Sequence, residues 1–231
     1  MADKKITALT QGIPVANDIL PYVSSPGASP VTQKTLYDNG GWIGAVGTWT
    51  YASATTITVP SGAATYYAVG DRIKLTQTTV KYFYVISVAD TALGITGGTD
   101  YTLTNAAITS PYFSHMASPV GFPSRFAYSP TIAFTAGTAP NTVSSGTYYF
   151  SLTGKTCTVS TFTIYTNAGS TVTGATVTLP IAHVSGTHSA YGSITVGATQ
   201  NLTNVYIGTT LILFCTSASA NRVNAGASYF I

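Results

Sequence analysis

Hydrophobic and polar residues alternate along most of the chain in short runs. Residues 69–76 alternate in this way, and residues 175–181 carry apolar side chains at every second position. A period of two is typical of a strand with one face in a core. Residues 81–88 are apolar on both faces, which predicts a central strand. No segment has the spacing of an amphipathic helix, so the pattern predicts an all-β protein.

Turn-forming residues separate these runs at intervals of about ten residues, which suits small sandwiches or open barrels. Four prolines between residues 110 and 130 force an irregular path, and we place a domain boundary there. The predicted β domains are residues 41–128 and 129–231. We also expect a short strand at residues 100–103, and a β-bulge at residues 160–161, where the alternation slips by one.

Residues 1–40 differ from the rest because four of the eleven prolines fall there. Such a stretch cannot form a long helix or build its own core. We expect an extended arm with one or two short strands, followed by the two small antiparallel domains of sandwich or barrel type (jelly-roll-like). The arm would add backbone to a partner surface, with alternate side chains filling pockets. The side chains expected to anchor it are Ile6, Leu9, Ile19, Leu20, Val23 and Val31.

Charged residues are scarce, at 6% of the 231 residues against a norm of about 25%. Glutamate is absent, and no carboxylate side chain follows Asp100. The 41 threonines and 22 serines supply neutral polar side chains instead, and threonine favours strands. With 45% hydrophobic residues, the chain is expected to fold. The nine Lys and Arg residues form no cluster, which argues against nucleic-acid binding.

No apolar run approaches the roughly 20 residues of a membrane-spanning helix, so we expect no membrane insertion. No apolar stretch follows Lys4 and Lys5, so no secretory signal is visible and synthesis in the cytoplasm is expected. Cys157 and Cys215 lack the spacing of a metal site. We interpret both as buried apolar residues in a reducing compartment, and a disulfide is the alternative.

The sequence offers few groups for catalysis. His183 and His188 are five residues apart, but the second domain holds no acid and no third histidine to complete a metal site. Asp71, Asp90 and Asp100 fit turns as well as they fit a catalytic role, and no nucleophile motif is present. We therefore expect no enzyme activity, no metal and no cofactor.

Tyrosine-rich stretches raise the possibility of sugar binding. Aromatic rings stack on sugar faces, and hydroxyl side chains bind sugars without the desolvation cost of full charges. The alternative is that tyrosine serves as a strand former whose polar tip reaches water. The candidates for glycan contact are Tyr148, Tyr149 and Tyr191.

The arm resembles the N-terminal segment of tailed-bacteriophage virion proteins, especially tail-fibre and tail-spike proteins. The similarity lies in Lys-Ile-Thr-Ala-Leu-Thr at residues 5–10, Ala-Asn-Asp-Ile-Leu-Pro at 16–21 and Pro-Val-Thr-Gln-Lys-Thr at 30–35. In that family, such a segment opens a subunit that attaches to the particle.

The rest of the chain resembles virion proteins as well. Residues 49–60, 70–77, 81–85 and 118–123 look like a small β domain that recurs in phage particles. The last domain is similar to C-terminal β-sandwich domains of phage fibres. Its similarity rests on residues 152–159, 177–180 and 226–230.

The resemblance implies a structural subunit of a tailed phage: a tail-fibre or receptor-binding appendage that contacts a host-surface glycan through its C-terminal sandwich. It also implies a homotrimer, with tail, collar or capsid proteins as the partners of residues 1–40. The expected location is the virion, after synthesis in the host bacterium's cytoplasm. The chain is short for a whole fibre and lacks a coiled shaft. A capsid decoration, head-fibre or collar protein that stabilises the particle is therefore the alternative.

Overall fold

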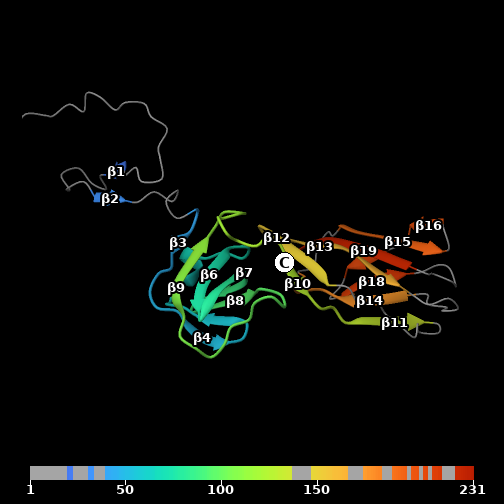
Figure 1. The fold of residues 1–231 in the computed structure, drawn as a ribbon, viewed down its shortest axis with the longest axis horizontal. Helices are drawn as coiled ribbons and strands as arrows, with labels where there is room; N and C mark the ends of the chain where they lie inside the picture. The colour runs from blue at the N-terminus through green and yellow to red at the C-terminus, as the bar shows by residue number, and fades with distance from the viewer. Residues whose placement is uncertain are drawn as a thin grey trace, which may run out of the picture.

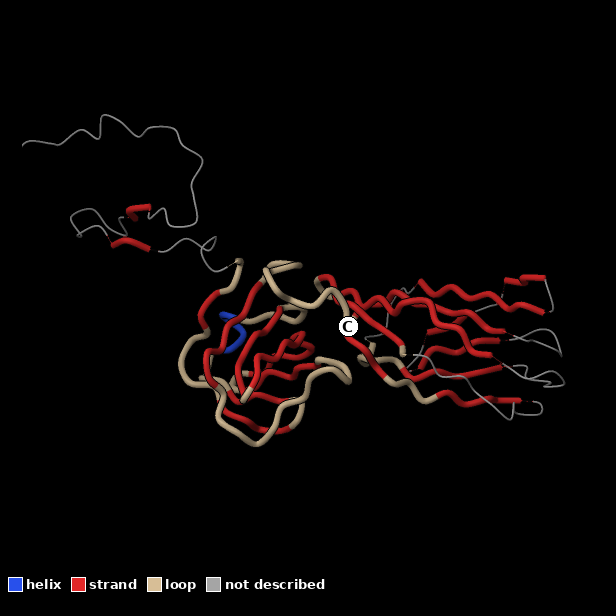
Figure 2. The backbone as a smooth tube through the Cα atoms, in the orientation of Figure 1, coloured by secondary structure: helices blue, strands red, loops and turns tan. Residues whose placement is uncertain are grey.

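The structure is a computed structural model. It describes residues 20–22, 31–33, 40–136, 147–165, 174–183, 189–196, 199–202, 205–207, 210–214 and 222–231. In these residues the regular structure is antiparallel β-sheet apart from one helical turn, α1 (Ala63–Tyr66) (Figures 1 and 2). The all-β prediction is therefore confirmed.

The first unit is a seven-stranded sheet with the strand order β3-β9-β6-β7-β8-β5-β4. Its strands are β3 (Ile43–Gly44), β4 (Thr50–Ser53), β5 (Thr56–Thr58), β6 (Arg72–Gln77), β7 (Thr79–Ala89), β8 (Ala92–Thr96) and β9 (Thr109–Ser114). One face of β6 buries Ile73 and Leu75, as the alternation predicts. These apolar side chains pack with Phe83 and Phe113 in the core of this unit.

Two sequence expectations for the first unit have opposite outcomes. The strand β7 lies between β6 and β8, which confirms the central strand predicted at residues 81–88. The strand predicted at residues 100–103 is wrong, because an isolated bridge between Gly97 and Tyr101 takes its place. The residues just after this segment are held by side-chain hydrogen bonds instead. The buried Gln77 amide of β6 donates to the carbonyl oxygens of Thr104 and Ala106.

The second unit contains a six-stranded sheet, ordered β10-β12-β13-β19-β15-β16, and a four-stranded sheet, ordered β11-β14-β18-β17. The six-stranded sheet comprises β10 (Phe126–Tyr128), β12 (Tyr148–Thr153), β13 (Thr156–Tyr165), β15 (Ser189–Val196), β16 (Thr199–Leu202) and β19 (Arg222–Phe230). The four-stranded sheet comprises β11 (Ile132–Ala136), β14 (Gly174–Thr178), β17 (Val205–Ile207) and β18 (Thr210–Phe214). Val177 of β14 lies in one core with Phe150, Val159 and Ala227, so the two sheets share that core.

Pairing within the second unit bears on two predicted features. The register between β13 and β19 shifts between Val159 and Phe162, which confirms the bulge expected at residues 160–161. The strand β10 pairs with β12, although its residues precede position 129. The chain ends at Ile231, whose backbone N–H donates to the Lys155 carbonyl oxygen beside the first unit (Figure 1).

The N-terminal arm is described over two short strands, β1 (Leu20–Tyr22) and β2 (Val31–Gln33). They pair antiparallel, with Leu20 opposite Gln33 and Tyr22 opposite Val31. Two of the expected anchoring residues therefore lie on paired strands. The other four, Ile6, Leu9, Ile19 and Val23, lie outside the described residues.

Candidate functional site

Val120 binds the start of the first unit, and we call Gly40, Trp42 and Val120 the arm root because they follow the predicted N-terminal arm. The Val120 backbone N–H donates to the Gly40 carbonyl oxygen at 2.8 Å, and the Val120 carbonyl oxygen accepts from Trp42 Nε1, also at 2.8 Å. Gly40 has a φ of +60°, and a Cβ there would lie 2.6 Å from the Val120 Cβ. Glycine is therefore needed for this close approach. Val120 therefore holds the chain on both sides of Gly41.

The Trp42 ring completes this arm root. It is 1% exposed and packs 6.2 Å from the Tyr82 ring and 6.1 Å from the Phe122 ring, measured between centroids. The Lys74 ammonium lies 4.7 Å from the Trp42 ring. A buried indole among aromatic rings adds both apolar burial and ring contacts to the two hydrogen bonds. Trp42, at the start of the first unit, is thus one of the most deeply buried side chains of that unit.

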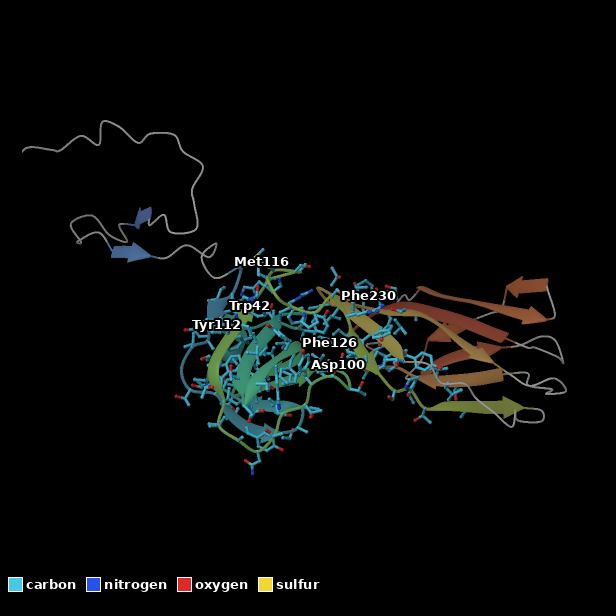
Figure 3. All side chains as sticks on the ribbon, viewed as in Figure 1. Trp42, Asp100, Tyr112, Met116, Phe126 and Phe230 are labelled. Carbon is cyan, nitrogen blue, oxygen red and sulfur yellow. The ribbon has the colours of Figure 1, made fainter. Side chains whose placement is uncertain are left out.

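A buried aromatic cluster joins the two units. Tyr84 of β7 packs edge-on against Phe126 of β10, with ring centroids 5.1 Å apart. Phe126 in turn lies 6.1 Å from Phe150 of β12. Phe126 is labelled at the junction in Figure 3. Because Tyr84 belongs to the core of the second unit, that core continues across the junction.

Arg72 reinforces the junction with a buried charge. It is 3% exposed, and its Nη2 donates to the Leu152 carbonyl oxygen at 2.6 Å. Its Nη1 donates to the Gly70 carbonyl oxygen, and the guanidinium carbon lies 5.3 Å from the Tyr84 ring centroid. Burial lowers the pKa of Arg72, and an arginine remains charged at neutral pH. Two backbone carbonyls and a ring therefore compensate this cation in part, while its buried Nε has no hydrogen-bond partner among the described residues.

The second polar contact of the junction involves both backbone groups of Ala127. The Thr99 N–H donates to the Ala127 carbonyl oxygen at 2.8 Å. The Ala127 N–H donates to Asp100 Oδ2, also at 2.8 Å. One turn of the first unit, at Thr99 and Asp100, thus supplies hydrogen-bond partners to both backbone groups of Ala127 in β10. Together with Arg72, this turn holds the two units in a defined relative orientation.

His115 and Asp71 form a contact that the sequence pattern does not predict. His115 Nδ1 lies 2.8 Å from Asp71 Oδ1, and Asp71 Oδ2 accepts a hydrogen bond from the Ala68 N–H at 2.8 Å. The Asp71 side chain is 7% exposed and that of His115 is 55% exposed. The pair ties the end of β9 to the start of β6. No local motif marks it, because pairing between the strands brings together residues 44 positions apart.

No family model, curated protein or solved structure matches this chain. In the described part of the chain, no helix is long and apolar enough to cross a membrane. The arm root, the junction and the surfaces around them are therefore the parts of the chain that bear on its function.

The tyrosines expected to contact a glycan occupy different environments. Tyr148 is 4% exposed, because the alternation of β12 turns it into the core with Phe150. Its ring thus offers no face to a glycan. Tyr149 is half-buried, and the guanidinium carbon of Arg125 lies 3.9 Å from its ring centroid. Tyr191 lies on β15 opposite Gly226, and its side chain is outside the described residues.

The residues considered for metal binding do not assemble within the described part of the chain. There, no three His, Cys, Asp or Glu side chains come together as a ligand set. The His183 ring lies 6.3 Å from the Tyr229 ring. Cys157 is fully buried, as predicted, and burial raises the pKa of its thiol to about 11. His188 and Cys215 lie outside the described residues.

Proposed function

We propose that this chain is a structural, non-enzymatic subunit of a tailed bacteriophage particle: a tail-fibre or receptor-binding appendage attached by its N-terminal arm. The observation that carries the proposal is the buried junction around Arg72, Tyr84 and Ala127. An appendage must hold its outer domain in a fixed relation to its anchor. A junction of shared core and hydrogen bonds serves that purpose, because displacement of one unit is transmitted to the other.

The arm root supports the same role. A load on the arm reaches the first unit through Gly40 and Trp42, which the backbone of Val120 binds at two points. The resemblance of residues 5–10, 16–21 and 30–35 to virion attachment segments supports an anchoring role for the arm. Its partners in this proposal are tail, collar or capsid proteins, and the chain is located in the virion.

The finer architecture belongs to the same proposal. It is an extended arm followed by two small β domains of sandwich or barrel type (jelly-roll-like), assembled as a homotrimer. The shared core of the six- and four-stranded sheets supports a sandwich in the second unit. The scarcity of charge suits subunit association, because burying unpaired ions is costly. The second unit faces outward, and Tyr149, which is partly exposed, is the tyrosine among the described side chains of that unit that contacts a host-surface glycan.

Substitutions within the full-length arm test this anchoring. Aspartates at Ile6, Leu9 and Val31 should abolish incorporation into particles, because charged side chains cannot fill apolar pockets. Aspartates at Thr7, Thr10 and Thr32 add the same charge at neighbouring polar positions and serve as the matched control. The readout is the amount of chain in purified particles. Normal incorporation of the first variant would refute the anchoring role.

Heating particles separates this proposal from its alternative, a capsid decoration, head-fibre or collar protein. Particles that lack a decoration protein should release their genome at a lower temperature than complete particles. Particles that lack an appendage should release it at an unchanged temperature but fail to attach to host cells. The appendage role predicts the second result.

A further inference from the structure

Hydroxyl side chains form a row across three adjacent strands of the six-stranded sheet. Thr158 of β13 lies opposite Ser151 of β12 on one side and opposite Ser228 of β19 on the other. The Thr158 Oγ1 and Ser228 Oγ atoms are 3.3 Å apart. Residues directly opposite one another across strands share a face, so the three hydroxyls lie side by side.

A second row, one step along the same strands, ends in an aromatic ring. Thr156 of β13 lies opposite Thr153 of β12 and opposite Phe230 of β19. Phe230 is 54% exposed and is labelled beside the junction in Figure 3. Its neighbour Tyr229 is 1% exposed, so β19 turns Tyr229 into the core and Phe230 away from it. We call the two rows the hydroxyl face: Ser151, Thr153, Thr156, Thr158, Ser228 and Phe230.

The side chains of the hydroxyl face are uncharged. No carboxylate side chain follows Asp100 in the sequence, so the second unit contributes none to this surface. The Arg125 guanidinium lies at one edge, where its carbon is 3.9 Å from the ring centroid of Tyr149. A charged ligand that lost its water here would gain few partners for its charge, whereas a neutral polar ligand can exchange hydrogen bonds with every hydroxyl.

This chemistry suits a saccharide better than a protein partner. Serine and threonine seldom carry the binding energy of protein–protein interfaces. A sugar hydroxyl both donates and accepts hydrogen bonds, as do the hydroxyls of Thr158 and Ser228. The exposed Phe230 ring offers an apolar surface to the C–H groups of a sugar ring.

The extent of the surface indicates the length of the ligand. Tyr149 precedes Ser151 by two residues on β12 and therefore shares its face. Tyr149 lies four residues from the row of Phe230 and two strands away, which corresponds to about 13 Å along the strands and about 10 Å across them. A single sugar ring cannot contact both aromatic side chains, whereas a chain of several sugars can.

We propose that the hydroxyl face binds a neutral saccharide chain of several units. This proposal rests on the glycan contact in the proposed function and names its surface and its class of glycan. One sugar ring lies on Phe230, and the hydroxyls of the chain exchange hydrogen bonds with Thr158 and Ser228. The other end of the saccharide reaches Tyr149, where the Arg125 guanidinium donates to sugar oxygens.

Three neutral glucose hexasaccharides that differ in linkage test the proposal on the full chain: maltohexaose, cellohexaose and laminarihexaose. Calorimetric titration should show binding of at least one, with free glucose at least tenfold weaker because it reaches only one end of the face. Added salt should leave this affinity unchanged, because no ion pair contributes to it. Binding of none of the three, or binding that is lost in high salt, would overturn the proposal.

Two matched pairs of variants locate the binding. Phe230→Ala should weaken it at least tenfold, whereas Tyr66→Ala, at a ring of the first unit that is 44% exposed, should leave it unchanged. Thr158→Val should weaken it at least threefold, whereas Thr58→Val, at an exposed position of β5, should not. Near-ultraviolet circular dichroism establishes that each variant is folded. Unchanged affinity in both Phe230→Ala and Thr158→Val would refute the site.

Sedimentation separates a saccharide from the other occupant of such a face, a second copy of this chain. The assembly state of Phe230→Ala should equal that of the unchanged protein, and dissociation of the variant would assign the face to self-association and overturn the proposal. The particle experiments test the virion role independently. A chain that is incorporated into particles but binds no saccharide refutes this site alone, and a chain that binds saccharide but is absent from particles refutes the virion role alone.

Discussion

The Arg72 guanidinium of the first unit donates a hydrogen bond to the Leu152 carbonyl oxygen of the second unit, 2.6 Å away. The donor is 3% exposed and the acceptor residue 1%. A charged donor that is buried against a carbonyl is costly to leave unpaired, so this bond strongly favours the docked arrangement. The guanidinium also donates to the Gly70 carbonyl oxygen and lies over the Tyr84 ring. The junction is therefore the part of the molecule where substitution has the clearest consequences.

Replacement of Arg72 by Met tests that bond. Methionine fills a similar volume but cannot donate to the carbonyl oxygens of Leu152 and Gly70. We expect the free energy of unfolding to fall by about 2–4 kcal/mol, because buried acceptors lose a charged donor. Arg125→Met is the control, since Arg125 is exposed above Tyr149 and a contact of that kind contributes about 0.5–1 kcal/mol. Urea unfolding measures both variants. Equal losses would contradict a specific role for Arg72.

Two glycines of the junction make a matched pair. Gly70 and Gly154 both have positive φ, at +97° and +56°. A Cβ on Gly70 would lie 2.1 Å from the Gly154 carbonyl oxygen, whereas a Cβ on Gly154 would meet nothing within 4 Å. Gly154→Ala should cost about 1 kcal/mol for its backbone conformation alone. Gly70→Ala should cost clearly more, because the two units must separate to accommodate the methyl group. If thermal melting shows equal costs, the close approach of the units is not as described.

The two tryptophans test the arm root. Trp42 Nε1 donates to the Val120 carbonyl oxygen, whereas Trp49 Nε1 is buried and has no hydrogen-bond partner among the described residues. Both rings are almost fully buried, so a change to Phe removes similar apolar volume from each. Trp42→Phe should therefore be the more destabilising by about 0.5–1.5 kcal/mol, because it removes a hydrogen bond that is partly shielded from water. Chemical denaturation gives the comparison. A larger loss in Trp49→Phe would contradict this role of the Trp42 hydrogen bond.

The sequence pattern predicted the strands better than it predicted what covers them. Alternation along β6 correctly marks Ile73 and Leu75 as core, but it leaves Arg72 on the opposite face, where a charged residue normally meets water. The second unit covers that end of the face. A period of two shows which residues share a face, but not which distant segment packs on it. The sequence also offers Tyr148 as a glycan contact, although its side chain is buried.

Local sequence patterns also do not predict contacts between side chains on different strands. His115 meets Asp71 because β9 lies beside β6, and no spacing rule links positions 44 apart. Lys74, Tyr112 and Trp42 come together for the same reason. By contrast, the bulge in β13 was predictable, because it is a local slip in alternation. Local sequence patterns thus predict the strands, whereas the pairing of strands in the sheet determines which distant residues come into contact.

The buried thiol predicts loss of stability in alkali. Burial raises the pKa of Cys157 to about 11, above its ordinary value of 9.0. The folded chain therefore keeps a proton that the unfolded chain releases, so stability is fully present below pH 9 and falls as the pH rises toward 11. In Cys157→Ala, the loss of unfolding free energy between pH 8 and pH 10 should be about 1 kcal/mol smaller. Urea midpoints at the two pH values provide the measurement. An identical pH dependence in both proteins would contradict this.

The most direct test of the proposed virion role is quantitative mass spectrometry of phage particles purified from a culture that produces this chain. A virion subunit should be present in a fixed number of copies per particle, unchanged by further purification. It should also be cleaved or labelled by reagents that reach only the particle surface. The account predicts a constant copy number and surface labelling. Absence of the chain from particles, or an amount that falls with each purification step, would contradict it.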